Sequence, residues 1–137
     1  MNTSPLPHED DNRVVRAYLV PAFHPHPREI LMIGLGAGSW LQILANCPEV
    51  ERITVIEINP GFVTIARHDP HVASAMTNPK VEIVIDDGRR FLTRTSRRFD
   101  LIVQNTIVFW RGHASTLLSR EYLELSRRHL KEGGFVY

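Results

Sequence analysis

The chain has 137 residues, of which 43% are hydrophobic and 23% are charged, and its formal net charge is +1 at pH 7. This length suits one domain, and this composition excludes wholesale disorder. The small net charge gives no electrostatic reason to expect a nucleic acid or a strongly acidic partner. Cys47 is the only cysteine, which excludes an internal disulfide and favours a reducing, cytoplasmic compartment.

Residues 1–27 predict a polar lead-in followed by a short helix. The first 12 residues lack the basic start and apolar run of a secretory signal. Arg13 to Phe23 can form a helix, although Pro21 weakens its last turn. The apolar residues expected on one side of this helix are Val14, Tyr18 and Leu19.

Residues 28–137 predict one α/β domain in which strands and helices alternate. The expected strands are Glu29 to Ile33, Arg52 to Ile58, Val81 to Ile85, Phe99 to Val103 and Phe135 to Tyr137. The expected helices are Ser39 to Asn46, which Ser39 can cap, Pro60 to Arg67 and Arg89 to Thr95. A last helix, which Ser119 can cap, runs to about Leu130 and is ended by Gly133-Gly134. Such alternation indicates a doubly wound, Rossmann-like parallel sheet with helices on both faces. The short fifth strand suggests a sheet that is incomplete at its C-terminus.

The segment from Ile30 to Cys47 carries no charged residue, and Gly34 and Gly38 have the spacing of a membrane-helix contact. However, it contains three glycines together with polar residues, so a strand, a loop and a helix explain it better. We therefore expect no direct membrane insertion by this segment.

The most informative motif is the loop Gly34-Leu35-Gly36-Ala37-Gly38, which lies between a buried strand and a helix. Residues without Cβ atoms allow a tight turn whose backbone N–H groups can approach a ligand closely, and the following helix N-terminus adds free donors. Glycine-rich turns without a ligand also occur, so the loop alone does not decide the function.

Two acidic residues strengthen the prediction of a nucleotide site. Glu57 ends the second strand, where an acidic residue about 20 residues beyond the glycine loop holds the hydroxyls of a ribose. Asp87 lies in the turn after the third strand, where its carboxylate could accept a hydrogen bond from an adenine amino group. Taken singly, Glu57 could be a solvated strand end and Asp87 a helix cap. Binding sites for nicotinamide and flavin cofactors favour a third glycine at the position where this chain has Ser39. The spacing of the glycines in this loop therefore fits a site for S-adenosylmethionine better.

The motifs Ile30 to Ser39, Val55 to Pro60 and Val81 to Gly88 resemble those of the spermidine synthase family of aminopropyltransferases. Phe99 to Val103, Leu118 to Leu123 and Leu130 to Gly134 continue the resemblance. It implies the fold of S-adenosylmethionine-dependent methyltransferases, with S-adenosylmethionine or its decarboxylated form as cofactor. The cofactor-binding residues implied are Gly34, Gly36, Gly38, Glu57, Ile58, Asp86, Asp87 and Gly88. Asn105 to His113 looks more like the spermidine-synthase-like domains of membrane-fused bacterial proteins.

The chain departs from the family at two acidic positions. The family has an acidic residue where this chain has Ala37, and an aspartate that helps to deprotonate the attacking amine where this chain has Asn105. An asparagine can accept a hydrogen bond from an amine but cannot act as a base. We therefore expect Asn105 to orient an amine or amide acceptor, with Trp110 and Arg111 lining the acceptor site.

The favoured function is a transferase that moves an aminopropyl group, or a methyl group, from the cofactor to a small amine. A methyltransferase and a non-catalytic nucleotide-sensing domain of a larger membrane protein remain alternatives. We expect a cytoplasmic location, and a sensing domain would be attached to a membrane through its parent protein. A homodimer is possible for each of these functions. We expect no metal, because His24, His26, His68 and His71 lie near prolines without a convergent set of ligands.

Overall fold

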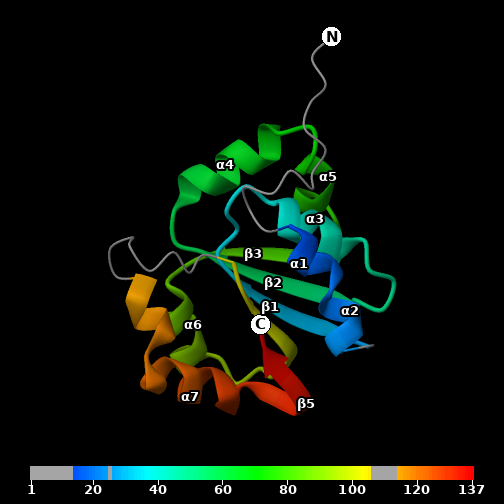
Figure 1. Ribbon diagram of the computed structural model, residues 1–137. Helices are drawn as coiled ribbons and strands as arrows, with labels where there is room; N and C mark the ends of the chain where they lie inside the picture. The colour runs from blue at the N-terminus through cyan, green and yellow to red at the C-terminus, as the bar shows by residue number, and fades with distance from the viewer. Residues whose placement is uncertain (1–13, 25, 106–113) are drawn as a thin grey trace.

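The computed structural model describes residues 14–24, 26–105 and 114–137. Five parallel strands form a single sheet in the order β3-β2-β1-β4-β5 (Figure 1). The strands are β1 (Glu29–Ile33), β2 (Arg52–Glu57), β3 (Val81–Ile85), β4 (Phe99–Gln104) and β5 (Leu130–Val136). In β1, Ile30, Leu31 and Met32 have no exposed surface, which is why the central strand is a continuous apolar run rather than an alternating one.

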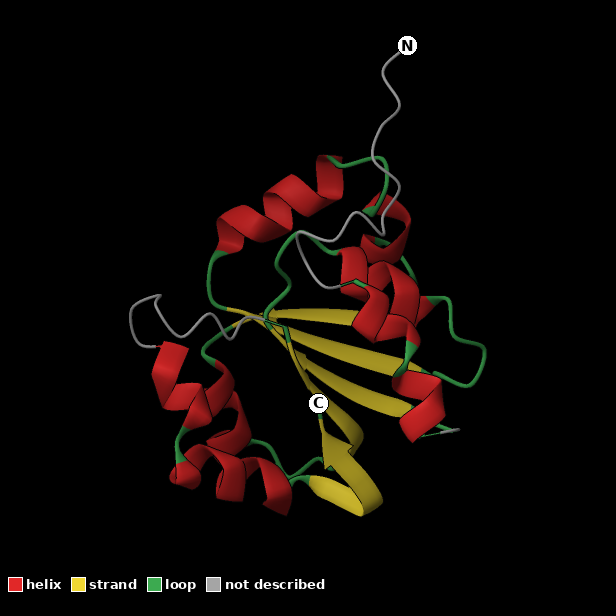
Figure 2. Ribbon diagram, viewed as in Figure 1, coloured by secondary structure: helices red, strands yellow, loops and turns green. Residues whose placement is uncertain are grey.

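Helices cover both faces of the sheet (Figures 1 and 2). One face carries α1 (Val15–Tyr18), α2 (Val20–Phe23), α3 (Ser39–Ala45), α4 (Pro60–His68) and α5 (Ala73–Met76). The other face carries α6 (Gly88–Arg94) and α7 (Arg120–Arg128), which is preceded by the 3-10 helix η1 (Ala114–Leu118). The expected doubly wound α/β fold is confirmed, and the uncharged segment from Ile30 to Cys47 forms β1, the glycine loop and α3. Within the described ranges, no helix is long and apolar enough to cross a membrane.

Helix starts follow the expected capping chemistry at Asn59 and Ser119 and depart from it at Ser39. Asn59 Oδ1 accepts a hydrogen bond from Gly61 N at 2.9 Å, and Ser119 Oγ accepts one from Tyr122 N at 3.2 Å. The prediction that Ser39 caps α3 is wrong, because Gly38 occupies the cap position with φ of 86° and no side-chain cap bond. The left-handed turn at Gly38 carries the chain into α3 directly, so Ser39 is already the first helical residue.

The predicted helix from Arg13 to Phe23 is divided into α1 and α2, and Arg13 lies outside the described residues. Pro21 supplies no backbone N–H for the helical ladder, so the first helix cannot continue through it. The predicted apolar side is also partly wrong, because Tyr18 and Leu19 are 61% and 46% exposed. The buried residues are Val14, Ala17 and Val20.

Gly133-Gly134 does not end the last helix, so this prediction is also wrong. α7 already ends at Arg128, and both glycines lie within β5. Leu130 pairs with Phe99 and Phe135 pairs with Leu101, so the chain bulges between these pairs and Gly133 takes a φ of 75°. The bulge lets Lys131 Nζ approach Asp100 Oδ2 at 3.1 Å.

The close approach of α6 to β1 gives a test of the packing. A Cβ atom on Gly88 would lie 2.8 Å from Cγ2 of Ile33, a buried side chain. We expect Gly88→Ala to lower the free energy of unfolding by about 1–3 kcal/mol, because the core must shift to admit the methyl group. Urea denaturation measures this change.

Gly61→Ala is the matched control, because Gly61 also lies in the first turn of a helix but is exposed. Its new methyl group would meet only the Asn59 side chain, at 3.1 Å. It should change stability by less than about 1 kcal/mol. Equal effects of the two substitutions would contradict the packing argument.

Candidate cofactor site

The predicted site residues meet at one edge of the sheet. Because all five strands are parallel, the segments that follow β1, β2, β3 and β4 leave the sheet at the same edge. The chain continues from β1 to β2 on one side, whereas β4 pairs with β1 on the other. Open α/β sheets bind ligands outside such a switch point, and the glycine loop lies there.

The glycine loop adopts backbone conformations that side chains disfavour. Gly34, Gly36 and Gly38 have φ values of 87°, 57° and 86°, in the left-handed region that glycine enters without steric cost. A Cβ atom on Gly36 would lie 3.2 Å from Asn105 Nδ2, and one on Gly38 would lie 3.2 Å from Val72. The loop therefore needs glycine for its path and for close contact with its neighbours.

Glu57 joins the first two strand ends through its carboxylate. Oε2 accepts a hydrogen bond from Leu35 N at 2.8 Å, and Oε1 accepts one from Asn59 N at 2.8 Å. The residue is only 2% exposed, so the interpretation of a solvated strand end is wrong. Hydrogen bonds to a charged acceptor are short and strong, and these two fix the glycine loop against the segment that starts α4.

Asn105 holds the same loop from the other side. Its backbone N donates to Ile33 O at 3.0 Å, and its side-chain Nδ2 donates to Leu35 O at 3.2 Å. Leu35 is thus bonded through its N–H to Glu57 and through its carbonyl to Asn105. With Nδ2 directed to the loop, Oδ1 is the end of the Asn105 amide that can accept a hydrogen bond from another molecule.

The two aspartates after β3 have separate roles in the structure. Asp87 Oδ1 accepts from Arg89 N at 2.8 Å and from Arg90 N at 3.0 Å, so Asp87 is the cap of α6. Asp86 pairs with Arg90, and its backbone N donates to Glu57 O at 3.2 Å. Desolvation acts to raise the pKa of Asp86, but hydrogen bonds from Arg90 and the Asp87 amide outweigh it and leave the pKa below its usual range.

Two isoleucines beside these carboxylates expose their side chains. Ile58 directly follows β2 and is 69% exposed, and Ile85 ends β3 and is 48% exposed. Glu57 and Ile85 are register partners, so both isoleucines lie at the β2–β3 end of the site. They provide an apolar surface beside the Glu57 and Asp87 carboxylates.

Two predicted site residues, Trp110 and Arg111, lie outside the described residues. No group of three or more His, Cys, Asp or Glu side chains that could hold a metal ion occurs in the described part of the chain.

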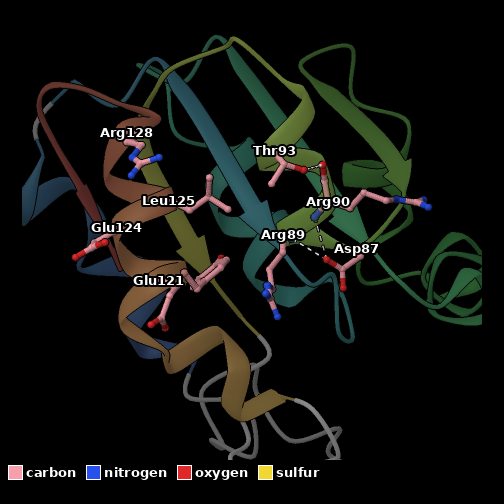
Figure 3. Close-up of a pocket in the computed structure, with 9 residues that line it drawn as sticks. Asp87, Arg89, Arg90, Thr93, Glu121, Glu124, Leu125 and Arg128 are labelled. Atoms are coloured by element: carbon pink, nitrogen blue, oxygen red, sulfur yellow. Dashed lines mark hydrogen bonds between the residues drawn. The ribbon is translucent and has the colours of Figure 1, made fainter.

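An open groove of about 610 Å³ lies between α6 and α7, and among its lining residues Asp87 alone is a predicted site residue (Figure 3). Figure 3 shows Thr93 and Arg89 on α6 facing the side of α7 that carries Leu125. The groove and the glycine loop therefore lie on different surfaces that meet near Asp87.

Sequence reasoning missed Leu35, Val72 and Ile85. Leu35 is fully buried, and its position as the one large residue among the glycines is the signal that could have identified it. Val72 contacts Gly38 from the segment before α5, a helix that was not predicted. No local pattern marks Val72, because its contact depends on how the chain returns to the loop.

The Glu57 hydrogen bonds can be tested with an isosteric change. We expect Glu57→Gln to lower the free energy of unfolding by about 1–3 kcal/mol, because an amide NH₂ would then face one of the two backbone N–H donors. Leu35 and Asn59 amide exchange should accelerate in the same variant. Glu51→Gln is the control, because the Glu51 side chain is 63% exposed and pairs with the exposed Arg28. Equal loss in the two variants would contradict a structural role for Glu57.

The contact between Gly36 and Asn105 can be separated from backbone strain. We expect Gly36→Ala and Gly133→Ala each to lose about 1–2 kcal/mol, because both glycines have positive φ. A methyl group on Gly133 meets no atom within 4 Å, whereas one on Gly36 meets Asn105. Only Gly36→Ala should therefore shift the side-chain amide resonances of Asn105 in an NMR spectrum, and an unshifted signal would contradict the contact.

The chain is similar to several proteins that are named polyamine aminopropyltransferases or spermidine synthases. It is 34% identical over 116 residues to the polyamine aminopropyltransferase of Streptococcus pneumoniae serotype 4, covering 84% of this chain and 40% of the relative. It is 36% identical over 115 residues to polyamine aminopropyltransferase 1 of Pseudomonas aeruginosa, covering 82% and 40%. For the spermidine synthase of Dictyostelium discoideum the identity is 34% over 119 residues, covering 85% and 42%. The chain thus spans about two fifths of the length of these relatives.

Solved structures agree with the fold. A spermidine synthase in complex with the transition-state analogue AdoDATO superposes with a TM-score of 0.78 at 25% identity, covering 88% of this chain and 43% of that one. The spermidine synthase of Thermotoga maritima gives a TM-score of 0.71 at 23% identity, covering 88% and 41%. The family model described as the spermine/spermidine synthase domain matches residues 17–137. The chain therefore belongs to the spermine/spermidine synthase family.

Proposed function

We propose that this chain binds decarboxylated S-adenosylmethionine at the glycine loop and serves the transfer of its aminopropyl group to a small amine. The observation that carries the proposal is the pair of hydrogen bonds from Leu35 and Asn59 to the Glu57 carboxylate. They hold a ribose-binding type of acid directly beside a glycine loop at the switch point of the sheet. The names of the polyamine aminopropyltransferase relatives support the choice of reaction.

The adenosyl group would lie across the ends of β1, β2 and β3. A carboxylate offers about four lone-pair positions, so Glu57 retains capacity for ribose hydroxyls after its two backbone bonds. The exposed Ile58 side chain offers an apolar surface to the adenine ring. Asp87 Oδ1 caps α6, and Oδ2 accepts no hydrogen bond from the described part of the chain. We assign Oδ2 to the adenine amino group, with Asp86 and Gly88 shaping the same turn.

The transfer is a displacement at the carbon next to the sulfonium. The amine nitrogen forms a bond to that carbon while the carbon–sulfur bond breaks, methylthioadenosine leaves with the bonding electrons, and the nitrogen loses a proton to solvent. Asn105 Oδ1 can accept a hydrogen bond from the amine and so orient its lone pair, but it cannot take the proton. Positioning supplies most of the rate in such a site. Trp110 and Arg111 stay part of this proposal as residues of the acceptor side.

Binding can be tested without knowing the acceptor. We expect calorimetry on the full chain to show binding of decarboxylated S-adenosylmethionine and methylthioadenosine. Ile58→Ala should weaken it about tenfold, because it removes apolar contact with the base. Ile65→Ala is the control, since Ile65 is 64% exposed on α4 and lies outside the proposed site. Binding that Ile58→Ala and Ile65→Ala affect equally would contradict the proposed adenine position.

The choice of ligand decides between the alternative functions. Release of methylthioadenosine in the presence of simple di- and triamines would support aminopropyl transfer, and its loss in Asn105→Ala would support the orienting role. A clear preference for intact S-adenosylmethionine, with methyl transfer, would replace the proposal with a methyltransferase. Nucleoside binding without turnover of any amine would favour a sensing domain. Binding of NAD that is lost in a Glu57 variant would show that decarboxylated S-adenosylmethionine is the wrong ligand.

A further inference from the structure

The acidic turn after β3 is held by an arginine of α6. Arg90 and Asp86 form an ion pair in which Arg90 Nε donates to Asp86 Oδ1. The same Asp86 oxygen accepts a hydrogen bond from Asp87 N at 2.6 Å. The backbone N of Arg90 donates to Asp87 Oδ1 at 3.0 Å. Arg90 therefore contacts both aspartates, one through its side chain and the other through its backbone.

The position of Arg90 is not one that helix stability favours. The N-terminal end of a helix dipole is positive, so acidic side chains are favoured in the first turn and basic ones are not. The first turn of α6 contains Arg89 and Arg90 and no acidic residue. In Figure 3 the Arg90 side chain points away from Leu125 of α7. The interaction that the described part of the chain gives to this guanidinium is the ion pair with Asp86.

Asp86 connects the two carboxylates that the proposed function assigns to the nucleoside. Its backbone N donates to Glu57 O at 3.2 Å, and its side chain accepts from Asp87 N. The Asp86 side chain is 13% exposed. Desolvation acts to raise its pKa, but hydrogen bonds from Arg90 and Asp87 outweigh it and lower the pKa. Asp86 is therefore an anion at neutral pH, and Arg90 is the cation paired with it.

Asp87 presents one carboxylate oxygen to a ligand. Oδ1 accepts from Arg89 N and Arg90 N, whereas Oδ2 accepts no hydrogen bond within the described ranges. Because Arg90 holds the Asp86 carboxylate, the bond from that carboxylate to Asp87 N fixes the peptide group before Asp87. The direction of Oδ2 follows from that peptide group and from the cap of α6.

We propose that Arg90 acts through Asp86 as a positioning residue, which directs Asp87 Oδ2 to the base and makes the site prefer an adenine nucleoside to a hypoxanthine nucleoside. The inference rests on the proposed function, which places the base beside Asp87. The amino group of adenine donates hydrogen bonds, whereas an oxo group in its place accepts them, as a carboxylate does. A polar group that the wrong ligand leaves unpaired is the strongest means of rejecting it. The rejection needs a fixed carboxylate.

Calorimetry on the full chain with methylthioadenosine and methylthioinosine tests the positioning role. We expect the wild-type chain to bind methylthioadenosine about 10–100-fold more tightly, as for a hydrogen bond to a charged group. Arg90→Ala should lower this ratio about tenfold. The reduction should come from weaker binding of methylthioadenosine, with the affinity for methylthioinosine unchanged.

Arg89→Ala is the matched control. It removes the same charge from the neighbouring residue of α6, and it keeps the backbone N–H that donates to Asp87. The Arg89 side chain forms no ion pair with the described part of the chain. The variant should keep the wild-type ratio, and equal ratios in Arg90→Ala and Arg89→Ala would overturn the proposal.

A double-mutant cycle shows whether Arg90 acts through Asp86. Asp86→Asn removes the charge that Arg90 pairs with, so it should also lower the preference for methylthioadenosine. When both substitutions are combined, the loss should be no larger than the greater single loss, because both break the same pair. Fully additive losses would show that Arg90 acts by another route and would overturn the proposal.

Amide exchange without a ligand separates this inference from the proposed function. Arg90→Ala should accelerate exchange of the Asp87 amide about tenfold, because the Asp86 carboxylate that accepts its hydrogen bond is no longer fixed. Arg89→Ala should leave it unchanged. Unchanged exchange in Arg90→Ala would overturn the positioning role while nucleoside binding stands. A wild-type chain that binds neither nucleoside would overturn the proposed function, and the base preference with it.

Discussion

The buried carboxylate of Glu57 is the interaction on which the site depends. A charge that is 2% exposed is stable only when its oxygens are satisfied, and both are, by backbone N–H groups of two different loops. The glycine loop has one hydrogen bond of its own, from Gly38 N to Leu35 O at 3.1 Å. It is also held by an acidic residue whose place at the end of β2 is set by the pairing of β2 with β1.

The opposite side of the loop is held by a neutral residue. Asn105 donates to Leu35 O. The loop is therefore held at the Leu35 N–H by the Glu57 carboxylate and at the Leu35 carbonyl by the Asn105 side-chain amide. Among Ala37, Asn105 and the glycines, no side chain can take a proton from an amine, and the Asp86 carboxylate is already paired with Arg90. The described residues beside the loop support binding and orientation, and in the proposed transfer the acceptor nitrogen would lose its proton to water or to a group outside the described residues.

The sequence predicted the sheet better than the helices. The bounds of β1 and β3 match the expected ones, because each is a compact run of five residues, most of them apolar. β5 was misjudged because Gly133-Gly134 normally ends a helix, and only the pairing with β4 reveals that these glycines form a bulge in a strand. The N-terminal helix failed for a related reason, since periodicity indicates an apolar side but not the turn at Leu19 that exposes it.

For the site, spacing predicted that the glycine loop, Glu57 and Asp87 follow or end parallel strands at one edge of the sheet, as they do, but not what they bind within the protein. The position of Glu57 at the end of β2 follows from the alternation of strands and helices. That its two oxygens accept from Leu35 and Asn59, and that Asp87 caps α6, depends on backbone directions that a spacing rule does not contain.

The strand order also constrains when the site can form. β1 lies at the centre of the sheet, and its partner β4 follows it far along the chain, with Ile30 paired to Leu101. Non-local pairing of this kind slows folding, because the entropy cost of closing a long loop comes before the stabilising contacts form. During synthesis from the N-terminus, β1, β2 and β3 can assemble early, with Glu57 already bound to the glycine loop. The contact between Asn105 and that loop cannot form until β4 has been made. The Glu57 contacts of the glycine loop can therefore form before the Asn105 contact.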